Sequence, residues 1–193
     1  GWGAVDQVGV DAGEGFTVNI PLPAGAGNAA YAAVFEHLVI PIATQFDPDL
    51  VIVCAGQDAS VFDPLARMSV TTDGYRAMCE AMLGIADACC EGKLVVTQEG
   101  GYAAEYAPYC SATIGQTLVG VTDEALRVPD PYGERAVGQP ASNIVGLDAE
   151  HVPAGVVGID HREVDLVAGA ADLVVDGQAL VGQRRRDRRR GRG

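Results

Sequence analysis

The segment from Leu50 to Met68, LVIVCAGQDASVFDPLARM, constrains the fold of this chain more than any other stretch. Its first five residues, Leu50 to Cys54, are all apolar, which is typical of a buried strand in a parallel sheet. Ala-Gly ends that strand and Asp58 follows, at the edge of the sheet where α/β proteins bind their ligands. The segment therefore predicts an α/β fold with Asp58 as a candidate functional acid.

Strand and helix patterns alternate on both sides of this segment. The expected elements are a strand at 16–20, a helix capped by Asn28, the strand at 50–54, a helix capped by Thr72 or Asp73, a buried strand at 93–97 and a helix at about 108–118. Pro41 is expected to kink the first helix without ending it. The alternation predicts a three-layer α/β/α architecture with a parallel sheet.

A second group of polar residues follows the strand at 93–97, in the order Gln-Glu-Gly-Gly-Tyr. The two adjacent glycines, Gly100 and Gly101, allow backbone conformations that present Tyr102 into a cleft. Because parallel strands end at the same edge of a sheet, Asp58 and Tyr102 are expected there together. A carboxylate in that place can bind a metal or act as a base, and a tyrosine hydroxyl can stabilise an oxyanion.

Charge and composition exclude several classes of function. Seven of the 13 basic residues and one of the 26 acidic residues lie in residues 184–192, so the rest of the chain has a net charge of −19. Such a surface repels nucleic acid and favours small cationic or peptide ligands. The sequence shows no apolar run of about 18 residues that would span a membrane. Its five cysteines form no CxxC pair, which indicates a reduced, cytoplasmic protein, and whether it forms a homo-oligomer is left open.

Four segments resemble the histone deacetylase and acetylpolyamine amidohydrolase family, and most of all its bacterial class II branch. They are GWGAVDQVG at 1–9, FTVNIPLPAGAG at 16–27, DLVIVCAGQDASVFDPLARM at 49–68 and EGGYAAEY at 99–106. The combination of AGxDA, DPL and EGGY in this order is specific. The resemblance covers about residues 1–120 and implies an arginase/deacetylase-like fold.

The resemblance also implies roles for individual residues. Asp58 matches a zinc ligand, Tyr102 the catalytic tyrosine, and Gly100, Gly101 and Leu65 the substrate channel. The implied activity is that of a zinc-dependent amidohydrolase, which removes acetyl or other acyl groups from acylated lysine or amines. In that mechanism zinc-bound water attacks the amide and the tyrosine stabilises the oxyanion. Leucine at position 65 favours acylated lysine as the substrate, and Asp63 is expected to have a structural role in its loop.

The family's other two zinc ligands and its histidine pair come from sequence upstream of Gly1. The three histidines of this chain, His37, His151 and His161, do not match them. We therefore expect a fragment, incomplete at the N-terminal side of the sheet, with one of three zinc ligands and no activity alone. The alternative is a catalytically silent binding or scaffold module with the deacetylase fold.

The expected organisation has three parts. Residues 1–148 are expected to form the C-terminal half of a deacetylase-like domain, residues 149–182 a poorly matched tail with a hairpin at 173–181, and residues 183–193 an Arg-rich disordered tail. Strands of the missing half are expected to separate the strands at 16–20 and 50–54. Without them the apolar strand edges would be open, and poor solubility is predicted.

Overall fold

The computed structural model describes residues 3–132, 170–175 and 178–183, the last two ranges by their backbone alone. The strands are β1 (Thr17–Ile20), β2 (Val51–Ala55), β3 (Leu94–Gln98), β4 (Ala170–Val175) and β5 (Gln178–Gln183). The helices are α1 (Asn28–Val34), α2 (Ile40–Phe46), α3 (Thr72–Cys90) and α4 (Ala107–Leu118). Every strand and helix that the sequence predicts is present, within one or two residues of the expected bounds, except that β4 begins three residues before the expected hairpin.

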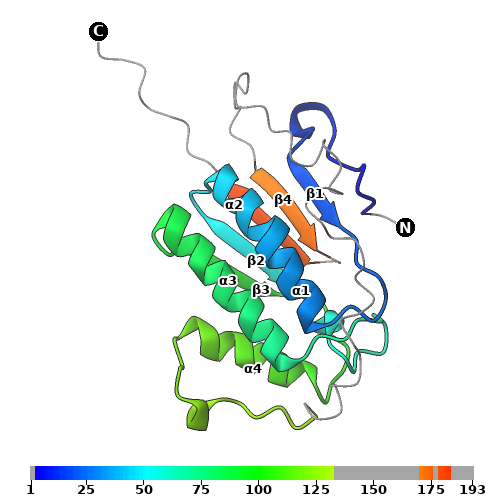
Figure 1. The fold of residues 1–193 in the computed structure, drawn as a ribbon, viewed down its shortest axis with the longest axis vertical. Helices are drawn as coiled ribbons and strands as arrows, with labels where there is room; N and C mark the ends of the chain where they lie inside the picture. Colours follow the sequence, from blue (N-terminus) through cyan, green and yellow to red (C-terminus); the bar gives the residue numbers. More distant parts are fainter. Residues whose placement is uncertain (1–2, 133–169, 176–177, 184–193) are drawn as a thin grey trace.

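The strands form one five-stranded sheet in the order β1-β4-β5-β2-β3 (Figure 1). β1 is parallel to β4 and β2 is parallel to β3, whereas β5 is antiparallel to both of its neighbours. Four strands therefore share one direction and β5 alone runs against them. The α/β class with a largely parallel sheet is confirmed.

The hairpin predicted near the C-terminus is formed by β4 and β5, and it lies between β1 and β2. The two strands are separated, as predicted, but by a hairpin of this chain and not by strands of the missing half. The prediction that their inner edges are open is wrong, because β4 pairs with β1 and β5 pairs with β2. The remaining predictions for residues 133–169 and 184–193, including those for the Arg-rich tail, His151 and His161, lie outside the described residues.

Pro41 does not end the first helix. α1 continues through a π turn, η2 (Phe35–Val39), directly into α2. Proline has no N–H and its ring would strike the carbonyl of His37 in a regular α-helix, so a wider turn before it relieves both problems. The distortion is therefore a π turn placed just before Pro41.

Two predicted helix caps are wrong by one residue. Gly27 is the N-cap of α1, and Thr71 is the N-cap of α3. Asn28 instead joins the two helix starts, because its side chain donates to the Thr71 hydroxyl (2.7 Å) and accepts from the Thr71 N–H (2.9 Å). Tyr75, Met78, Met82 and Ile85 lie on the buried side of α3.

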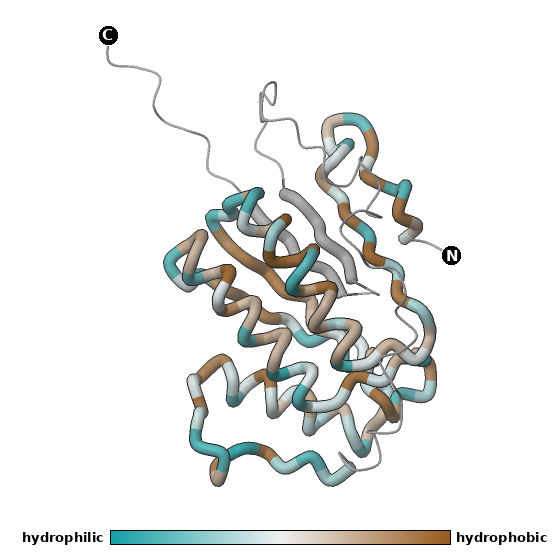
Figure 2. The backbone as a smooth tube through the Cα atoms, viewed as in Figure 1, coloured by the Kyte–Doolittle hydropathy of each residue, from teal (hydrophilic) through white to brown (hydrophobic). Residues whose placement is uncertain are grey.

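The helices α1, α2 and α3 lie on one face of the sheet (Figure 1), and β2 forms a hydrophobic stretch of the tube in Figure 2. Val51 and Ala55 of β2 are buried in the core on that face. β3 was expected to be buried, and this is wrong: Val95 is 46% exposed. β3 is the last strand of the sheet, and among the described residues no helix covers the face to which Val95 belongs.

Residues Asn28–Phe46, from α1 to α2, form a helix that by length and composition alone could cross a membrane. In the structure its apolar side faces the protein interior, where Tyr31, Val34, Val39 and Ala43 are buried. α1 and α2 both pack against α3. One side of this helix therefore packs against the protein core.

Candidate functional site

The carboxylate of Asp58 lies in a slot between two glycines. Asp58 belongs to the short 3-10 turn η3 (Gln57–Ala59), which follows the end of β2. A Cβ atom placed on Gly56 would be 2.5 Å from Asp58 Oδ1, and one placed on Gly100 would be 2.5 Å from Oδ2. Only glycine leaves room for the carboxylate on both sides. Among the described residues the carboxylate accepts no hydrogen bond, so its oxygens are available to a ligand.

The loops after β2 and β3 are held together by backbone hydrogen bonds. The Gln57 N–H donates to the Gly100 carbonyl at 2.8 Å, and the Glu99 N–H donates to the Ala55 carbonyl at 3.0 Å. Gly101 has a φ of +133°, which favours glycine, and a Cβ there would be 2.8 Å from the Cβ of Gln57. The structure thus places the Asp58 and Tyr102 loops side by side, as expected for parallel strands that end at the same edge of a sheet.

Tyr102 and Leu65 are exposed side chains on these adjoining loops. The exposed fractions are 58% for Tyr102 and 69% for Leu65. The Tyr102 hydroxyl has no hydrogen-bond partner within the described part of the chain. Its position is therefore set by the backbone that carries it, and the hydroxyl is free to donate to a bound carbonyl.

Asp63 connects the two loops. From the sequence, it was expected to have a structural role only in its own loop. Its Oδ1 accepts from the N–H groups of Leu65 (2.8 Å) and Ala66 (3.0 Å), and its Oδ2 accepts from the N–H of Tyr102 (2.8 Å). Burial alone would raise the pKa of this carboxyl. The hydrogen bonds from Tyr102, Leu65, Ala66 and Ala103 outweigh burial and lower the pKa below 3.8. The Asp-Pro-Leu order indicates only the bonds within the loop.

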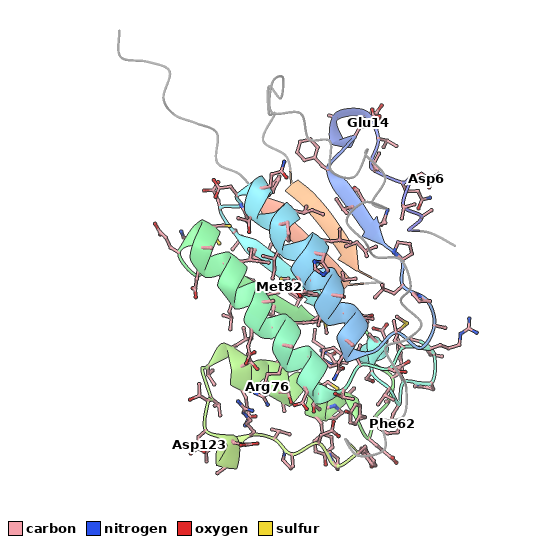
Figure 3. The ribbon with its side chains drawn as sticks, in the orientation of Figure 1. Asp6, Glu14, Phe62, Arg76, Met82 and Asp123 are labelled. Atoms are coloured by element: carbon pink, nitrogen blue, oxygen red, sulfur yellow. The ribbon has the colours of Figure 1, made fainter. Side chains whose placement is uncertain are left out.

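Three aromatic rings support the loop that carries Asp63. Phe62, which precedes Asp63 in the chain and is labelled in Figure 3, has its ring centroid 5.0 Å from those of both Tyr106 and Tyr132. The Tyr106 hydroxyl donates to Asp130 and accepts from the Thr72 N–H. Burial, followed by the hydrogen bond with Asp130, raises the pKa of Tyr106 well above its usual value, so this hydroxyl stays protonated. The residues around Asp130 look like an ordinary turn in the sequence, which hides this contact.

A second buried tyrosine holds the end of β2. The Tyr75 hydroxyl donates to the Gly56 carbonyl at 3.2 Å, directly before the Asp58 turn. Burial raises the pKa of Tyr75 far above its usual value, with smaller contributions from neighbours that include Asp58. Tyr75 is therefore a neutral donor that fixes the backbone beside Asp58.

The residues present fit one part of a metal site. The Asp58 carboxylate, set between glycines and without a partner in the part of the chain that the structure describes, is a suitable oxygen ligand for zinc. Within the described residues there is no cluster of three His, Cys, Asp or Glu side chains that could hold a metal ion. His37 is exposed in the π turn η2.

The fold and the two adjoining loops define an α/β protein of the arginase–deacetylase class. A family model for the histone deacetylase domain matches residues 1–118, and the chain therefore belongs to the histone deacetylase family. Histone deacetylase 8 of Arabidopsis thaliana is 39% identical over 130 residues, which are 67% of this chain and 33% of that protein. The histone deacetylase-like amidohydrolase of Pseudomonas aeruginosa is 39% identical over 129 residues, 67% of this chain and 34% of that protein.

Solved structures agree with this assignment. The HDA15 HD domain matches with a TM-score of 0.58 and 33% identity, over 80% of this chain and 40% of that one. The histone deacetylase Clr3 matches with a TM-score of 0.57 and 35% identity, over 67% of this chain and 20% of that one. The arginase/deacetylase-like fold is confirmed. The chain spans about a third of the length of the curated relatives above.

Proposed function

We propose that the protein is a zinc-dependent amidohydrolase that removes acetyl or other acyl groups from acylated lysine or amines. One observation carries this proposal: the Asp58 carboxylate lies between Gly56 and Gly100 with no hydrogen-bond partner among the described residues, beside the loop that presents Tyr102. Relatives named histone deacetylase and histone deacetylase-like amidohydrolase support it. Since the chain spans about a third of these relatives, the activity, substrates and partners are proposed for the whole protein.

Each site residue has a separate task in this proposal. Asp58 would supply one oxygen ligand to zinc. Zinc, when bound, would act as a Lewis acid toward the acyl carbonyl and would promote the ionisation of water. Tyr102 would donate its hydroxyl proton in a hydrogen bond to the carbonyl oxygen as negative charge develops there, which is worth about 3–4 kcal/mol. Leu65, Gly100 and Gly101 would line the channel for the acyl chain.

The substrate preference, the class II branch and the cytoplasmic location are part of the same proposal. The apolar Leu65 at the exposed edge favours acylated lysine, and the class II branch is proposed from the motifs of the sequence. A cytoplasmic location is supported by the free thiols of all five cysteines, none of which forms a disulfide within the described residues.

We further propose that the 193-residue chain alone binds zinc weakly or not at all and has no deacetylase activity. Catalytic zinc sites use three protein ligands, and Asp58 is a single candidate ligand. Metal analysis that finds one tightly held zinc per purified chain would contradict this.

Because Asp58 is a single candidate ligand, a second candidate function is a deacetylase-fold binding or scaffold module without metal. The described residues contain no complete metal cluster, which favours it. Metal analysis of the full-length protein and its Asp58→Ala variant separates the two functions. The amidohydrolase proposal predicts one zinc per chain that is lost in Asp58→Ala and retained in an Asp6→Ala control. A wild-type protein without zinc and without hydrolysis of an acetyl-lysine peptide would instead identify the scaffold.

A further inference from the structure

We propose that Asp63 is a positioning residue, which holds the backbone of Tyr102 in the place where its hydroxyl meets the substrate. The inference rests on the proposed function for the role of Tyr102. It concerns a residue 39 positions away in the chain, whose contact with Tyr102 is made through the backbone.

The carboxylate of Asp63 binds both loops at once. One oxygen accepts from Leu65 and Ala66, in the turn of its own loop, and the other accepts from Tyr102 across the gap. Asp63 is buried, with 9% of its surface exposed. A charged acceptor makes stronger hydrogen bonds to backbone N–H groups than a neutral one. Asp63 therefore ties the exposed Leu65 and the exposed Tyr102 to one rigid group.

The hydrogen bond from the Tyr102 N–H to Asp63 fixes a part of the loop that the backbone pairing of the two loops does not hold. The backbone pairing of the two loops holds the chain as far as the Gly100 carbonyl. Gly101 follows with a φ of +133°, a conformation that glycine leaves and enters easily. The next backbone anchor is the Tyr102 N–H on Asp63. Because the Tyr102 side chain has no partner in the described residues, this hydrogen bond decides where its hydroxyl lies.

The substitution Asp63→Asn separates the two roles of Asp63, which are to hold the turn of its own loop and to hold Tyr102. A carboxamide has one acceptor oxygen, which can stay with the two N–H groups of Leu65 and Ala66. Its NH2 group would then face the N–H of Tyr102, donor against donor. The turn would be retained while Tyr102 is released. A displacement of about 1 Å of a catalytic group can reduce turnover by about 100-fold.

The test is steady-state hydrolysis of an acetyl-lysine peptide by the full-length, zinc-loaded protein. Asp63→Asn is expected to lower kcat by about 10- to 100-fold with little change in KM and in zinc content. Asp6→Asn is the matched control, since Asp6 is exposed in the N-terminal loop, well away from Phe62 and the site (Figure 3). The double variant Asp63→Asn/Tyr102→Phe is expected to be no slower than Tyr102→Phe, because no hydroxyl is left to position. Losses that multiply in the double variant, or an unchanged kcat in Asp63→Asn, would overturn the proposal.

Amide hydrogen exchange tests the contact independently of activity. Asp63→Asn should accelerate exchange at the Tyr102 N–H and leave the Gln57 N–H, which is bonded to Gly100, unchanged. If the wild-type protein hydrolyses no peptide, the proposed function fails, and this measurement still decides whether Asp63 holds Tyr102. Equal acceleration at both amides, or at neither, would overturn the positioning role.

Discussion

Replacing Gly100 with alanine should displace the proposed zinc ligand without unfolding the protein. The new Cβ would be 2.5 Å from Asp58 Oδ2 and 2.9 Å from Asp58 Cγ, against an ordinary contact of 3.4–4 Å. The carboxylate must therefore move by about 1 Å, a misplacement that matters for a site of fixed geometry. Since the clash is with the end of a side chain that can rotate, we expect the cost in stability to stay at or below the 1–3 kcal/mol of an overpacked core.

Gly100→Ala is also expected to weaken zinc binding. Misplacing the surroundings of a ligand typically weakens metal affinity by about 10- to 100-fold, or about 1.4–2.7 kcal/mol. Zinc affinity is measured on the full-length protein by competition with a chromophoric chelator, and stability by urea unfolding.

Gly115→Ala is the matched control for this measurement. Gly115 is exposed in α4, and a Cβ added there meets nothing within 4 Å. Alanine favours a helix over glycine by about 0.8–1 kcal/mol, so this variant should be slightly more stable and bind zinc normally. If Gly100→Ala binds zinc as tightly as Gly115→Ala, Asp58 is not the ligand in the place where the structure puts it.

Further predictions concern the stability of the fold. Tyr106→Phe removes the hydroxyl that donates to Asp130 and accepts from the buried Thr72 N–H, and should cost about 1–3 kcal/mol in urea unfolding; an unchanged midpoint would show that these contacts contribute nothing. Met82→Ala, in the buried face of α3, should cost about 2–5 kcal/mol, whereas Leu126→Ala, at a 66% exposed residue, should stay within about 0.5 kcal/mol. The folded pKa of Asp63 lies below its unfolded value, so its contribution is complete above about pH 4 and is lost as the pH falls through the lowered pKa. Asp63→Asn should therefore reduce the fall in stability between about pH 5 and 2, and an acid profile identical to that of the wild type would contradict this.

The sequence identifies the ends of β2 and β3 because apolar runs followed by Gly and polar residues mark where parallel strands stop. That local pattern brings Asp58 and Tyr102 to one edge of the sheet, as the structure shows. It does not distinguish a central strand from an edge strand, since apolar residues at 94–96 suit both, and the exposure of Val95 depends on which strands lie beside β3.

Contacts between distant segments were the main features that sequence patterns left out. Asn28 has the composition of a helix cap, yet its amide binds Thr71, which is 43 residues away. Asp63 has the pattern of a local turn, and its bond to Tyr102 depends on the two loops lying side by side. The hairpin of β4 and β5 is recognisable from alternation around Asp-Gly. Its place between β1 and β2 depends on the edges that those strands offer and on no local pattern.

The most direct test of the proposed activity is the turnover of an acetyl-lysine peptide by the full-length protein and its Tyr102→Phe variant, with zinc content measured on the same samples. Removing one oxyanion donor predicts a fall in kcat of about 100- to 1,000-fold with an unchanged amount of zinc per chain. Equal turnover by the two proteins would contradict the role of Tyr102 and, with it, the proposed mechanism.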